Sequence, residues 1–347
     1  MSNKRMTMTV VAAAAGAGAA LLLRRRVRRS PTAPRAPEPA PVPGELSLLV
    51  TAHERIADGV ALLRLEGPGL PRWTPGAHLD LVLPSGLVRQ YSLCGDPADT
   101  SCYTVATRLV ADGRGGSREV HEQVRVGTEL RVRGPRNRFP LVEAASYGFV
   151  AGGIGITPLL PMVRSLPEGT RWRLLYGGRS RASMPFLAEL AELDPDGDRI
   201  TVVAEDEDGL PDLDGFLTGR PADTEVYCCG PEPMMAAVAE RMPAGRAPHL
   251  ERFAPRGAAG GGEFEVELRR TGQVLTVRPG TSILTAVRAE LPRTPYSCEQ
   301  GWCGTCQQRV LAGEIDHRDE LLTDAERGDS MLICVSRARG ERLVLDM

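Results

Sequence analysis

The sequence predicts a multidomain protein: an antiparallel β-barrel or sandwich, then an α/β unit with a parallel sheet, then a small α+β unit. Three observations support this order. Short runs of alternating apolar and polar residues occupy 45–142, which indicates half-buried antiparallel strands. Apolar, strand-like runs alternate with helical segments over 143–254, which indicates a parallel sheet. Behind a glycine-rich linker at 255–262, residues 263–347 combine short strands with one helix.

The expected elements follow the chain in order. Six strands are expected in the first unit, at 46–56, 60–67, 78–83, 89–94, 102–109 and 129–134. Four buried strands are expected in the second unit, at 146–152, 171–178, 199–206 and 225–230, with helices at 157–166, 183–193 and 232–242. The third unit is expected to contain strands at 263–270 and 273–280, a helix at 282–291 and a closing strand at 341–347.

The composition is that of a globular protein with an uneven charge. The 347 residues are 42% hydrophobic and 25% charged, and this length allows two or three domains. Residues 1–44 carry eight basic residues and one acidic residue, whereas the rest of the chain carries 34 basic and 43 acidic residues. An acidic body argues against nucleic acid as a partner.

The N-terminal segment 1–44 has two parts. Residues 7–23 are uncharged and precede "RRRVRR" at 24–29. This stretch has the shortest length that spans a bilayer, about seventeen residues, and a dense basic block argues against a signal peptide. The arginines would hold the C-terminal side of the stretch in the cytoplasm. A weak membrane anchor and a peripheral or disordered arm both remain open, and residues 31–44 are a proline-rich spacer.

Two loops of the second unit suggest an anion site. In "VAGGIGITPLLPM", Gly152, Gly153 and Gly155 follow a strand and allow a phosphate to approach the backbone closely. Thr157 suits an N-cap and Pro158 the first helical position, so the helix N-terminus would face the anion. An ordinary strand–helix turn remains an alternative. The loop "CCGPEPMM" ends a later strand of the sheet, so both loops are expected in one crevice.

The first unit offers weaker signals. In "RQYSLCG", Arg89 and Tyr91 lie on one face of a strand. An arginine can bind a phosphate with two hydrogen bonds, and an aromatic ring beside it can pack on a flat ligand. Downstream, Gly115, Gly116 and Ser117 could present backbone N–H groups at a helix start. Taken singly, these signals are weak, and a surface arginine and a core tyrosine explain the residues better.

The third unit contains the most specific pattern, a set of four cysteines. Cys298, Cys303 and Cys306 are separated by four and then two residues, and Cys334 follows twenty-eight positions later. This is the plant-type [2Fe–2S] spacing. A structural zinc site usually has two paired-ligand units, and disulfides are uncommon in cytosolic chains. Two irons need four thiolates, so the four cysteines are predicted to ligate a cluster.

In this order, the three units resemble the phthalate dioxygenase reductase family, within the ferredoxin–NADP reductase superfamily. The resemblance covers about residues 45–347. Nine motifs carry it: "RQYSL", "GRGGS", "GGIGITPLLPM", "YGGRSR", "CGPEPMM", "ERF", "SCEQGWCGTC", "DHRD" and "MLICVSRA". It implies an FMN-binding β-barrel at 45–142, an NAD(P)-binding α/β domain at 143–254 and a β-grasp [2Fe–2S] ferredoxin domain at 263–347.

The resemblance also implies roles for individual residues. Arg89 and the turn at Gly116 and Ser117 would hold the FMN phosphate, while Tyr91 and Ser92 would contact the isoalloxazine. Cys229 would lie near the nicotinamide, and Phe253 would cover the other face of the flavin. Ser92 and Cys229 are therefore the predicted catalytic residues. The remaining predicted cofactor contacts are Gln90, Gly115, Gly152, Gly153, Gly155, Thr157, Pro158, Arg179, Ser180, Gly230 and Pro231.

The implied function is electron transfer. NAD(P)H delivers two electrons as a hydride and a [2Fe–2S] cluster accepts one at a time, so the flavin between them converts one mode into the other. The family implies a Rieske-type terminal oxygenase as partner, and other members serve haem monooxygenases or demethylases. Arg179 and Arg181 lie where a 2′-phosphate would bind, yet "RS" also suits NADH, so NADH is favoured and NADPH remains possible.

Two features depart from the family pattern. Trp302 replaces a smaller residue inside the ligand loop and would shield the cluster, contact the partner or simply pack. The segment 1–44 suggests tethering to the cytoplasmic face of a membrane, with a desaturase, hydroxylase or haem monooxygenase as an alternative partner. The protein is otherwise expected to be monomeric. A non-catalytic electron carrier and a cluster-based redox or iron sensor are the competing functions.

Overall fold

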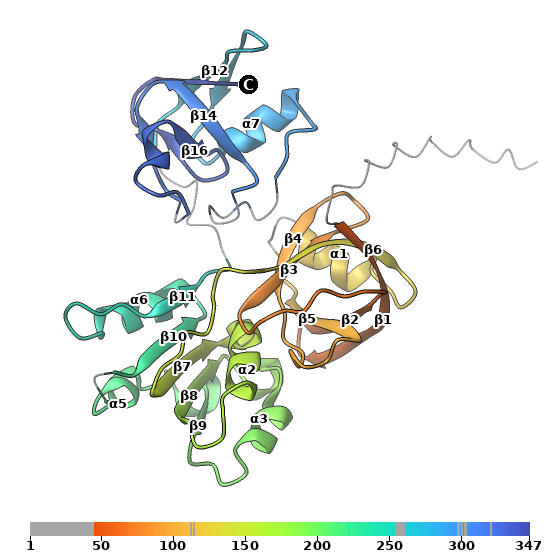
Figure 1. The fold of residues 1–347 in the computed structure, drawn as a ribbon, viewed down its shortest axis with the longest axis vertical. Coiled ribbons are helices and arrows are strands. Elements are labelled where there is room, and N and C mark those ends of the chain that lie inside the picture. Colours follow the sequence, from red (N-terminus) through yellow and green to blue (C-terminus); the bar gives the residue numbers. More distant parts are fainter. Residues whose placement is uncertain are drawn as a thin grey trace, which may run out of the picture. The chain divides into compact units, whose positions relative to one another are not determined.

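The computed structural model describes residues 45–111, 113, 115–221, 223–253, 261–296, 299, 301, 304–319 and 321–347, and its elements are labelled in Figure 1. The expected anchor and spacer, most of the linker, Cys298, Trp302 and Cys303 lie outside this part. Within the described residues, no helix has the length and apolar character needed to cross a membrane.

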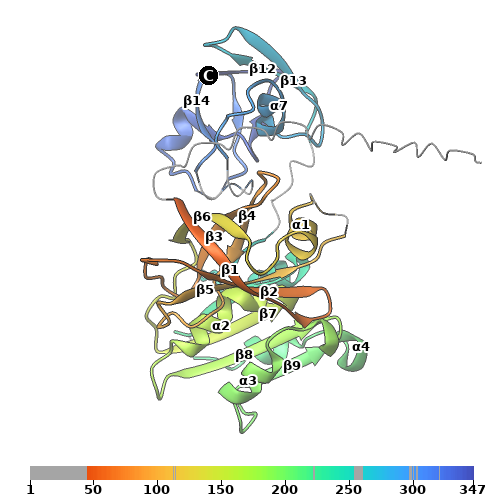
Figure 2. The same cartoon turned by 90° about the vertical axis from the view of Figure 1, so that its right-hand side faces the viewer.

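The first unit is a six-stranded antiparallel barrel (Figure 2). Its strands are β1 (Glu45–Ala57), β2 (Val60–Glu66), β3 (Ala77–Val82), β4 (Val88–Ser92), β5 (Cys102–Arg108) and β6 (Glu129–Asn137). They pair in the order β4-β3-β6-β1-β2-β5. A single bridge between Leu93, directly after β4, and Val105 of β5 brings the two edges of the sheet together. The six strands expected from the sequence are all present.

Alternation explains the packing of this barrel. Leu63 and Leu65 of β2 are fully buried, while Arg64 between them is exposed, because successive strand residues point to opposite faces. The helix α1 (Gly116–Glu122) adds to the same core, since Val120 and the nearby Val124 are buried among the barrel leucines. The turn before α1 is thereby held against the barrel.

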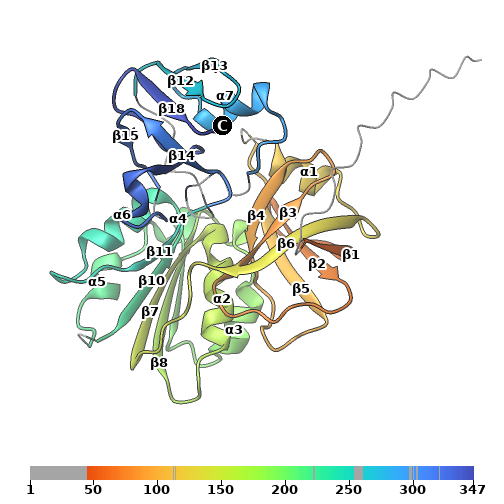
Figure 3. The ribbon, with the colours of Figure 1, turned by 45° about the horizontal axis from the view of Figure 1, so that its top comes forward.

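The second unit has a five-stranded parallel sheet in the order β11-β10-β7-β8-β9. The strands are β7 (Ser146–Gly152), β8 (Arg171–Gly178), β9 (Ile200–Ala204), β10 (Glu225–Cys229) and β11 (His249–Glu251). The helices are η1 (Gly153–Gly155), α2 (Ile156–Arg164), η2 (Arg181–Ser183), α3 (Leu187–Leu193), α4 (Glu205–Asp208), α5 (Leu213–Leu217) and α6 (Glu232–Glu240). Helices α2 and α3 cover one face, and α5 and α6 cover the other (Figures 1 and 3).

Three sequence-based expectations for this unit need correction. Strand β11 and the short helices α4 and α5 were not expected, because three to five residues carry too little periodicity to be recognised. The expected strand at 199–206 ends earlier, at Ala204. Thr157 is not an N-cap: η1 continues directly into α2, whose N-cap is Gly155. Thr157 therefore lies inside the helix, where its hydroxyl donates to the Ile154 carbonyl at 2.9 Å.

The third unit is a small mixed sheet with one helix packed on it. Five strands pair in the order β13-β12-β18-β14-β16. The elements are β12 (Phe264–Leu268), β13 (Gln273–Val277), α7 (Ile283–Glu290), β14 (Gln307–Ala312), β15 (Ile315–Asp316), η3 (Glu326–Gly328), β16 (Ser330–Leu332), β17 (Arg337–Ala338) and β18 (Arg342–Leu345). Ser282 caps α7 by accepting a hydrogen bond from the Thr285 N–H at 3.0 Å. Buried Ile283 and Val287 of α7 meet Val266 and Leu343 of the sheet.

Candidate active site

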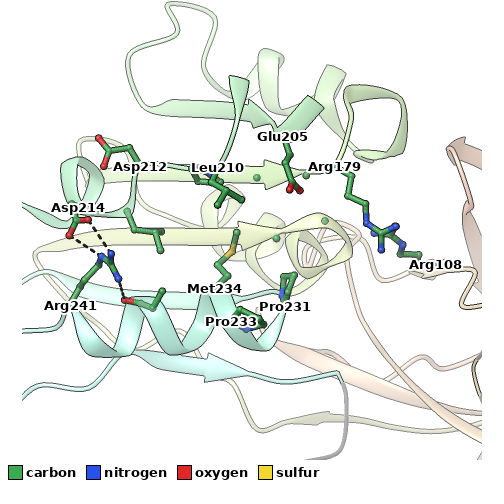
Figure 4. Close-up of a pocket in the computed structure, with 17 residues that line it drawn as sticks. Arg108, Arg179, Glu205, Leu210, Asp212, Asp214, Pro231, Pro233, Met234 and Arg241 are labelled. Carbon is green, nitrogen blue, oxygen red and sulfur yellow. Dashed lines mark hydrogen bonds and ion pairs between the residues drawn. The ribbon is translucent and has the colours of Figure 1, made fainter. Parts of the chain in front are cut away.

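The carboxyl ends of the parallel strands form a cavity of about 540 Å³. Such an edge is where α/β sheets bind ligands. Gly152 and Gly153 after β7, Arg179 after β8 and Pro231 after β10 line the cavity, so both predicted loops meet there. Figure 4 shows Glu205 and Arg179 on neighbouring strand ends, with Pro231 and Met234 below them.

Close approach between the two loops requires their glycines. A Cβ atom on Gly155 would lie 2.1 Å from the Cys229 carbonyl oxygen, and one on Gly152 would lie 2.5 Å from Cδ of Pro231. Gly153 has a φ of +54°, a conformation that side chains disfavour. Gly230 is packed against Gly152 in the same way. The glycines thus bring the η1 turn against the end of β10.

Two arginines face this cavity side by side (Figure 4). Arg108 comes from β5 of the barrel, and its Nη1 lies 3.2 Å from where a Cβ of Gly153 would be. Burial and the nearby Arg179 lower the pKa of Arg108. Within the described part of the chain, neither guanidinium has an ion-pair partner, so both could bind an anion in the cavity. The sequence analysis missed Arg108, because a lone arginine at a strand end carries no motif.

Three polar side chains meet where the barrel contacts the nucleotide unit. Ser92 ends β4, and its hydroxyl donates to Oε2 of Glu251 at 3.3 Å. Glu251 ends β11, directly beside Cys229 at the end of β10. All three residues are buried. Burial raises the pKa of Glu251 to about 8, and burial with the neighbouring Glu251 raises the pKa of Cys229 well above its usual value.

The Glu251 carboxyl and the Cys229 thiol can therefore both be protonated, and so uncharged, at neutral pH. Glu251 is neutral at pH 7, since its pKa is about 8, and Cys229 remains a thiol. A neutral carboxyl can donate one hydrogen bond and accept another. Glu251 was not among the residues predicted from the sequence, although the motif "ERF" contains it. The signal that finds it is burial of an unpaired carboxylate, which only the folded structure supplies.

The predicted phosphate end of the flavin site is also assembled. Arg89 of β4 lies over the start of α1: a Cβ on Gly116 would be 2.4 Å from its Nε. Gly115, the N-cap of α1, has a φ of +82°. The Ser117 hydroxyl accepts a hydrogen bond from the Val110 N–H at 3.0 Å, which ties this turn to the end of β5. An arginine beside a glycine turn fits a phosphate monoester such as that of FMN.

Two of the predicted ring contacts lie on β4, and the third, Phe253, follows β11 of the nucleotide unit. Tyr91 is half-buried in β4, and burial raises the pKa of its phenol. Gln90 lies between Arg89 and Tyr91 with its side chain half-buried. Phe253, two residues beyond Glu251, is 39% exposed. An exposed aromatic side chain beside a buried polar cluster suits a planar ligand such as an isoalloxazine.

The remaining predicted contacts divide into two groups. Thr157 and Pro158 are buried in α2, behind the glycine turn, and do not line the cavity. Ser180 follows Arg179 and closes the turn before η2, its Oγ lying 3.2 Å from Oγ of Ser183. These three residues shape the loops rather than the surface of the cavity.

For the cluster, the structure describes two of the four predicted ligands. Cys306 and Cys334 are buried in the third unit, whereas Cys298 and Cys303 lie outside the described residues. The described parts of the loop wind tightly, with left-handed φ values of 54°, 84° and 73° at Glu299, Gly301 and Gly304. A Cβ on Gly301 would lie 2.8 Å from Val335, next to Cys334. This winding brings the loop against the fourth cysteine, as a four-thiolate cluster requires.

A buried acidic residue supports that loop from behind. Asp319, in the motif "DHRD", accepts hydrogen bonds from the Leu322 N–H at 3.0 Å and the Ser336 hydroxyl at 3.3 Å. Arg327 lies 3.6 Å from its carboxylate. The Cα of Asp319 would be 3.1 Å from a Cβ on Gly301. This hydrogen-bond network is therefore in contact with the ligand loop.

Comparison with known proteins identifies both cofactor units. Residues 266–339 match the family described as 2Fe-2S iron-sulfur cluster binding domain, and residues 149–240 match the oxidoreductase NAD-binding domain. The chain is 43% identical over 315 residues to phenoxybenzoate dioxygenase subunit beta of Ectopseudomonas oleovorans, covering 87% of this chain and 97% of that protein. It is 38% identical over 320 residues to phthalate dioxygenase reductase of Burkholderia cepacia, covering 88% and 98%.

Solved structures agree with these relatives. The structure of phthalate dioxygenase reductase, described as modular for electron transfer from pyridine nucleotides to [2Fe–2S], matches with a TM-score of 0.69 and 37% identity, over 88% of this chain and 98% of that one. An intact type IV self-sufficient cytochrome P450 monooxygenase matches with a TM-score of 0.70 and 38% identity; this chain spans 41% of it.

These comparisons confirm the fold class and the family expected from the sequence. The barrel, the parallel-sheet unit and the ferredoxin unit occur in the expected order. The chain therefore belongs to the phthalate dioxygenase reductase family and is an NAD(P)H oxidoreductase that uses FMN and a [2Fe–2S] cluster.

Proposed function

We propose that this chain passes electrons from NADH to a Rieske-type terminal oxygenase, through FMN and then the cluster. The observation that carries the proposal is the meeting of Ser92, Cys229 and Glu251 beside a cavity that accepts a dinucleotide. Relatives whose names describe them as dioxygenase or monooxygenase reductase subunits support an oxygenase as the acceptor.

The bound cofactors supply the electron transfer, and the chain positions them. In this proposal Arg89 and the Gly116–Ser117 turn hold the FMN phosphate, and Tyr91 lies along the ring. Arg108 and Arg179 hold the dinucleotide phosphates. With the FMN phosphate and the dinucleotide phosphates both held by the protein, the nicotinamide would be aligned over the isoalloxazine ring. Such alignment is the main contribution of binding groups that do not react.

Ser92, Cys229 and Glu251 act at the reacting ends of the two cofactors in this proposal. Because Glu251 is neutral at pH 7, it adds no charge near a hydride in transit. The Cys229 thiol fills the space beside it without ionising. The Ser92 hydroxyl donates to Glu251, and the neutral acid can in turn donate to a ring atom of the flavin. A dry, uncharged contact of this kind also excludes water.

Arg181 and Glu205, beyond the ends of β8 and β9, favour NADH, whereas Arg179 lines the cavity and keeps NADPH possible. Arg181, which the sequence placed near a 2′-phosphate, pairs instead with Glu207 at 2.8 Å and with Asp208 at 3.7 Å, and it does not line the cavity. Glu205 does line the cavity (Figure 4). A carboxylate there accepts hydrogen bonds from a ribose hydroxyl and repels a phosphate.

A haem monooxygenase is the second candidate acceptor, because a self-sufficient cytochrome P450 contains a region 38% identical to this chain. The two candidates are separated by reconstitution. The purified holoprotein is mixed with NADH and either a Rieske-type oxygenase or a P450 from the native host, and coupled turnover is measured. Reduction of the cluster by NADH without turnover of any Rieske-type oxygenase would contradict the proposed acceptor. Failure of NADH to reduce the bound flavin would contradict the reductase itself.

The N-terminal segment adds a proposal on location. Residues 7–23 and the arginines at 24–29 lie outside the described residues, so their role rests on the sequence alone. We propose that they tether a monomeric reductase to the cytoplasmic face of a membrane, which suits a membrane-bound desaturase or hydroxylase as well. Fractionation of cells expressing the full chain tests this, and recovery of all of it in the soluble pool would contradict it.

A further inference from the structure

The nucleotide unit has a second cavity at the opposite edge of its sheet. It measures about 380 Å³ and lies at the amino ends of β7, β8 and β9. The dinucleotide cavity lies at the carboxyl ends of these strands, so the two are separated by the length of the sheet. The residues that give the second cavity its charge are Arg171, Arg173, Arg199 and Arg220. We call it the arginine cavity.

The charge of the arginine cavity is uncompensated. No carboxylate is among the described residues that line it. In the described part of the chain, none of its four arginines forms an ion pair; Arg199 instead stacks on Trp172, with its guanidinium carbon 5.4 Å from the ring centre. This is unusual in a chain whose residues beyond 44 carry 34 basic and 43 acidic groups. Four cations around one cavity repel one another unless an anion joins them.

Arg220 is built into the floor of this cavity. Its guanidinium carbon lies 3.7 Å from the centre of the Phe216 ring, and its Nε donates to the Phe216 carbonyl at 2.5 Å. Strand β7 makes room for it with Gly148, since a Cβ there would lie 1.7 Å from Nη1 of Arg220. Arg220 is thus held in one orientation by a ring on one side and a bare backbone on the other.

One donor of this fixed guanidinium is unused. Nη2 of Arg220 is buried and has no hydrogen-bond partner. Burial, and secondarily Arg173, lower the pKa of Arg220 to about 10, which still leaves it charged at pH 7. A buried, unsatisfied, charged donor is costly, and an anion in the cavity would stabilise the charge of this guanidinium.

Two hydroxyls add a further donor. Ser146 starts β7, and its Oγ lies 2.7 Å from Oγ1 of Thr224 before β10. In a hydroxyl pair one group donates to the other, so the second proton is available to a third acceptor. Both side chains are buried and both line the cavity. The cavity therefore offers guanidinium and hydroxyl donors together, a combination that suits a tetrahedral oxyanion.

We propose that the arginine cavity binds a phosphate dianion, either free or as a small organic ester. Arg220 provides a charge held in one orientation, Arg171 and Arg173 line the cavity from β8, and Arg199 lines it from the residue before β9. A dianion matches the local charge better than a monovalent carboxylate. Its binding requires neither the flavin nor the cluster, so the site does not depend on the proposed acceptor.

Isothermal titration of the holoprotein tests this site. Inorganic phosphate and glycerol 3-phosphate are titrated separately, with saturating NAD⁺ present so that the dinucleotide cavity is already filled. The expected result is one site with a Kd of about 1 mM or tighter. Tighter binding of the ester would identify an organic phosphate as the natural ligand, and equal binding would identify the free anion; either supports the site.

Variants locate the binding. Arg220→Met keeps the packing on Phe216 and is expected to weaken phosphate about tenfold or more. Arg173→Gln changes an exposed side chain and is expected to weaken it severalfold, which covers the case in which Arg220→Met does not fold. Arg55→Gln, an exposed arginine paired with Asp58 on the barrel, is the matched control and should leave binding unchanged. Loss of binding in the control, unchanged binding in both cavity variants, or binding of a glutamate-rich peptide but no phosphate would overturn the proposal.

Discussion

Two regions of the site treat charge in opposite ways. Where the barrel meets the nucleotide unit, Ser92, Cys229 and Glu251 are buried and uncharged at pH 7. The dinucleotide cavity beside them shows charged groups on several strand ends, among them Arg108, Arg179 and Glu205. The difference suggests a general arrangement: charged groups that bind the ligand stay in contact with solvent, and groups near the reacting atoms are buried and neutral. In the proposed function, the charged groups would bind the phosphates and ribose of the dinucleotide, and the neutral groups would surround the atoms that react.

The largest effect is expected where the two regions touch. Gly155→Ala would place a Cβ 2.1 Å from the Cys229 carbonyl, so the η1 turn and the end of β10 must separate. We expect a loss of about 3 kcal/mol or more in the free energy of unfolding and near-complete loss of flavin reduction by NADH. Urea denaturation and stopped-flow absorbance measure the two effects.

Gly197→Ala is the matched control for this change. Gly197 has a positive φ, +74°, whereas Gly155 has a φ of −65°, and no atom lies within 4 Å of the Cβ position of Gly197. It should cost about 1 kcal/mol and leave flavin reduction intact. Equal behaviour of the two variants would show that the close approach at Gly155 has no special role.

A second prediction tests the neutrality of the reaction region through pH. The pKa of Glu251 is raised from 4.5 to about 8 in the folded protein, so the folded state retains its proton over this interval and the unfolded state does not. The stabilisation that this proton provides is fully present below pH 4.5 and is lost as pH rises through about 8. Flavin reduction is expected to fall as pH rises through about 8 and to be about tenfold lower roughly one unit above it.

Glu251→Gln sharpens this prediction, because glutamine keeps the shape of the neutral acid and cannot ionise. The variant should show a flatter dependence on pH in both chemical denaturation and flavin reduction. The Ser92 hydroxyl can still donate to the amide oxygen. A wild-type fall above pH 8 that persists unchanged in the variant would assign the ionisation to another group.

The third prediction addresses the charged region. Arg108→Gln removes one of the two guanidiniums that face the dinucleotide phosphates. The KM for NADH should rise about tenfold with little change in kcat, since the lost interaction is made equally in the ground and transition states. Arg55→Gln, remote from the cavity, should change neither constant. A fall in kcat at constant KM would instead place Arg108 in the reaction step.

The smallest effect is expected at Glu205. Glu205→Gln removes the carboxylate that would repel a 2′-phosphate, and the selectivity for NADH over NADPH should fall about threefold. The effect is small because the pocket is open to solvent, which screens the charge. Comparing kcat/KM for the two donors measures it. Unchanged selectivity would mean that a 2′-phosphate does not approach β9.

Most of the fold was predictable from sequence because its signals are periodic and local. Alternation in β2 around Leu63 and Leu65, and the long apolar runs of β7 and β8, identify an antiparallel and a parallel sheet. Short elements such as β11 escaped, since three residues carry no period. The start of α2 was misplaced for a related reason: Thr157 and Pro158 suit a helix start, but the turn at Gly153–Gly155 extends the helix backwards.

Of the candidate site, the sequence identified residues within motifs and missed those that act alone. Gly152, Gly153, Arg179 and Pro231 were expected and line the dinucleotide cavity. Arg108 comes to the same cavity from a different domain, and no spacing in the sequence relates it to them. The role of Arg220 could likewise not be predicted from the sequence. Its position depends on Gly148, in a strand more than seventy residues earlier in the chain.

By itself, the sequence determined the order of the three units, the family and the cluster-ligand spacing, because these depend on periodicity and on short motifs. Only the tertiary structure decided that Glu251 joins Ser92 and keeps its proton, and that four arginines share one cavity. The physical reason is that burial and proximity are properties of side chains from distant segments. A carboxylate, a thiol or a guanidinium acquires its protonation state from what surrounds it in the fold.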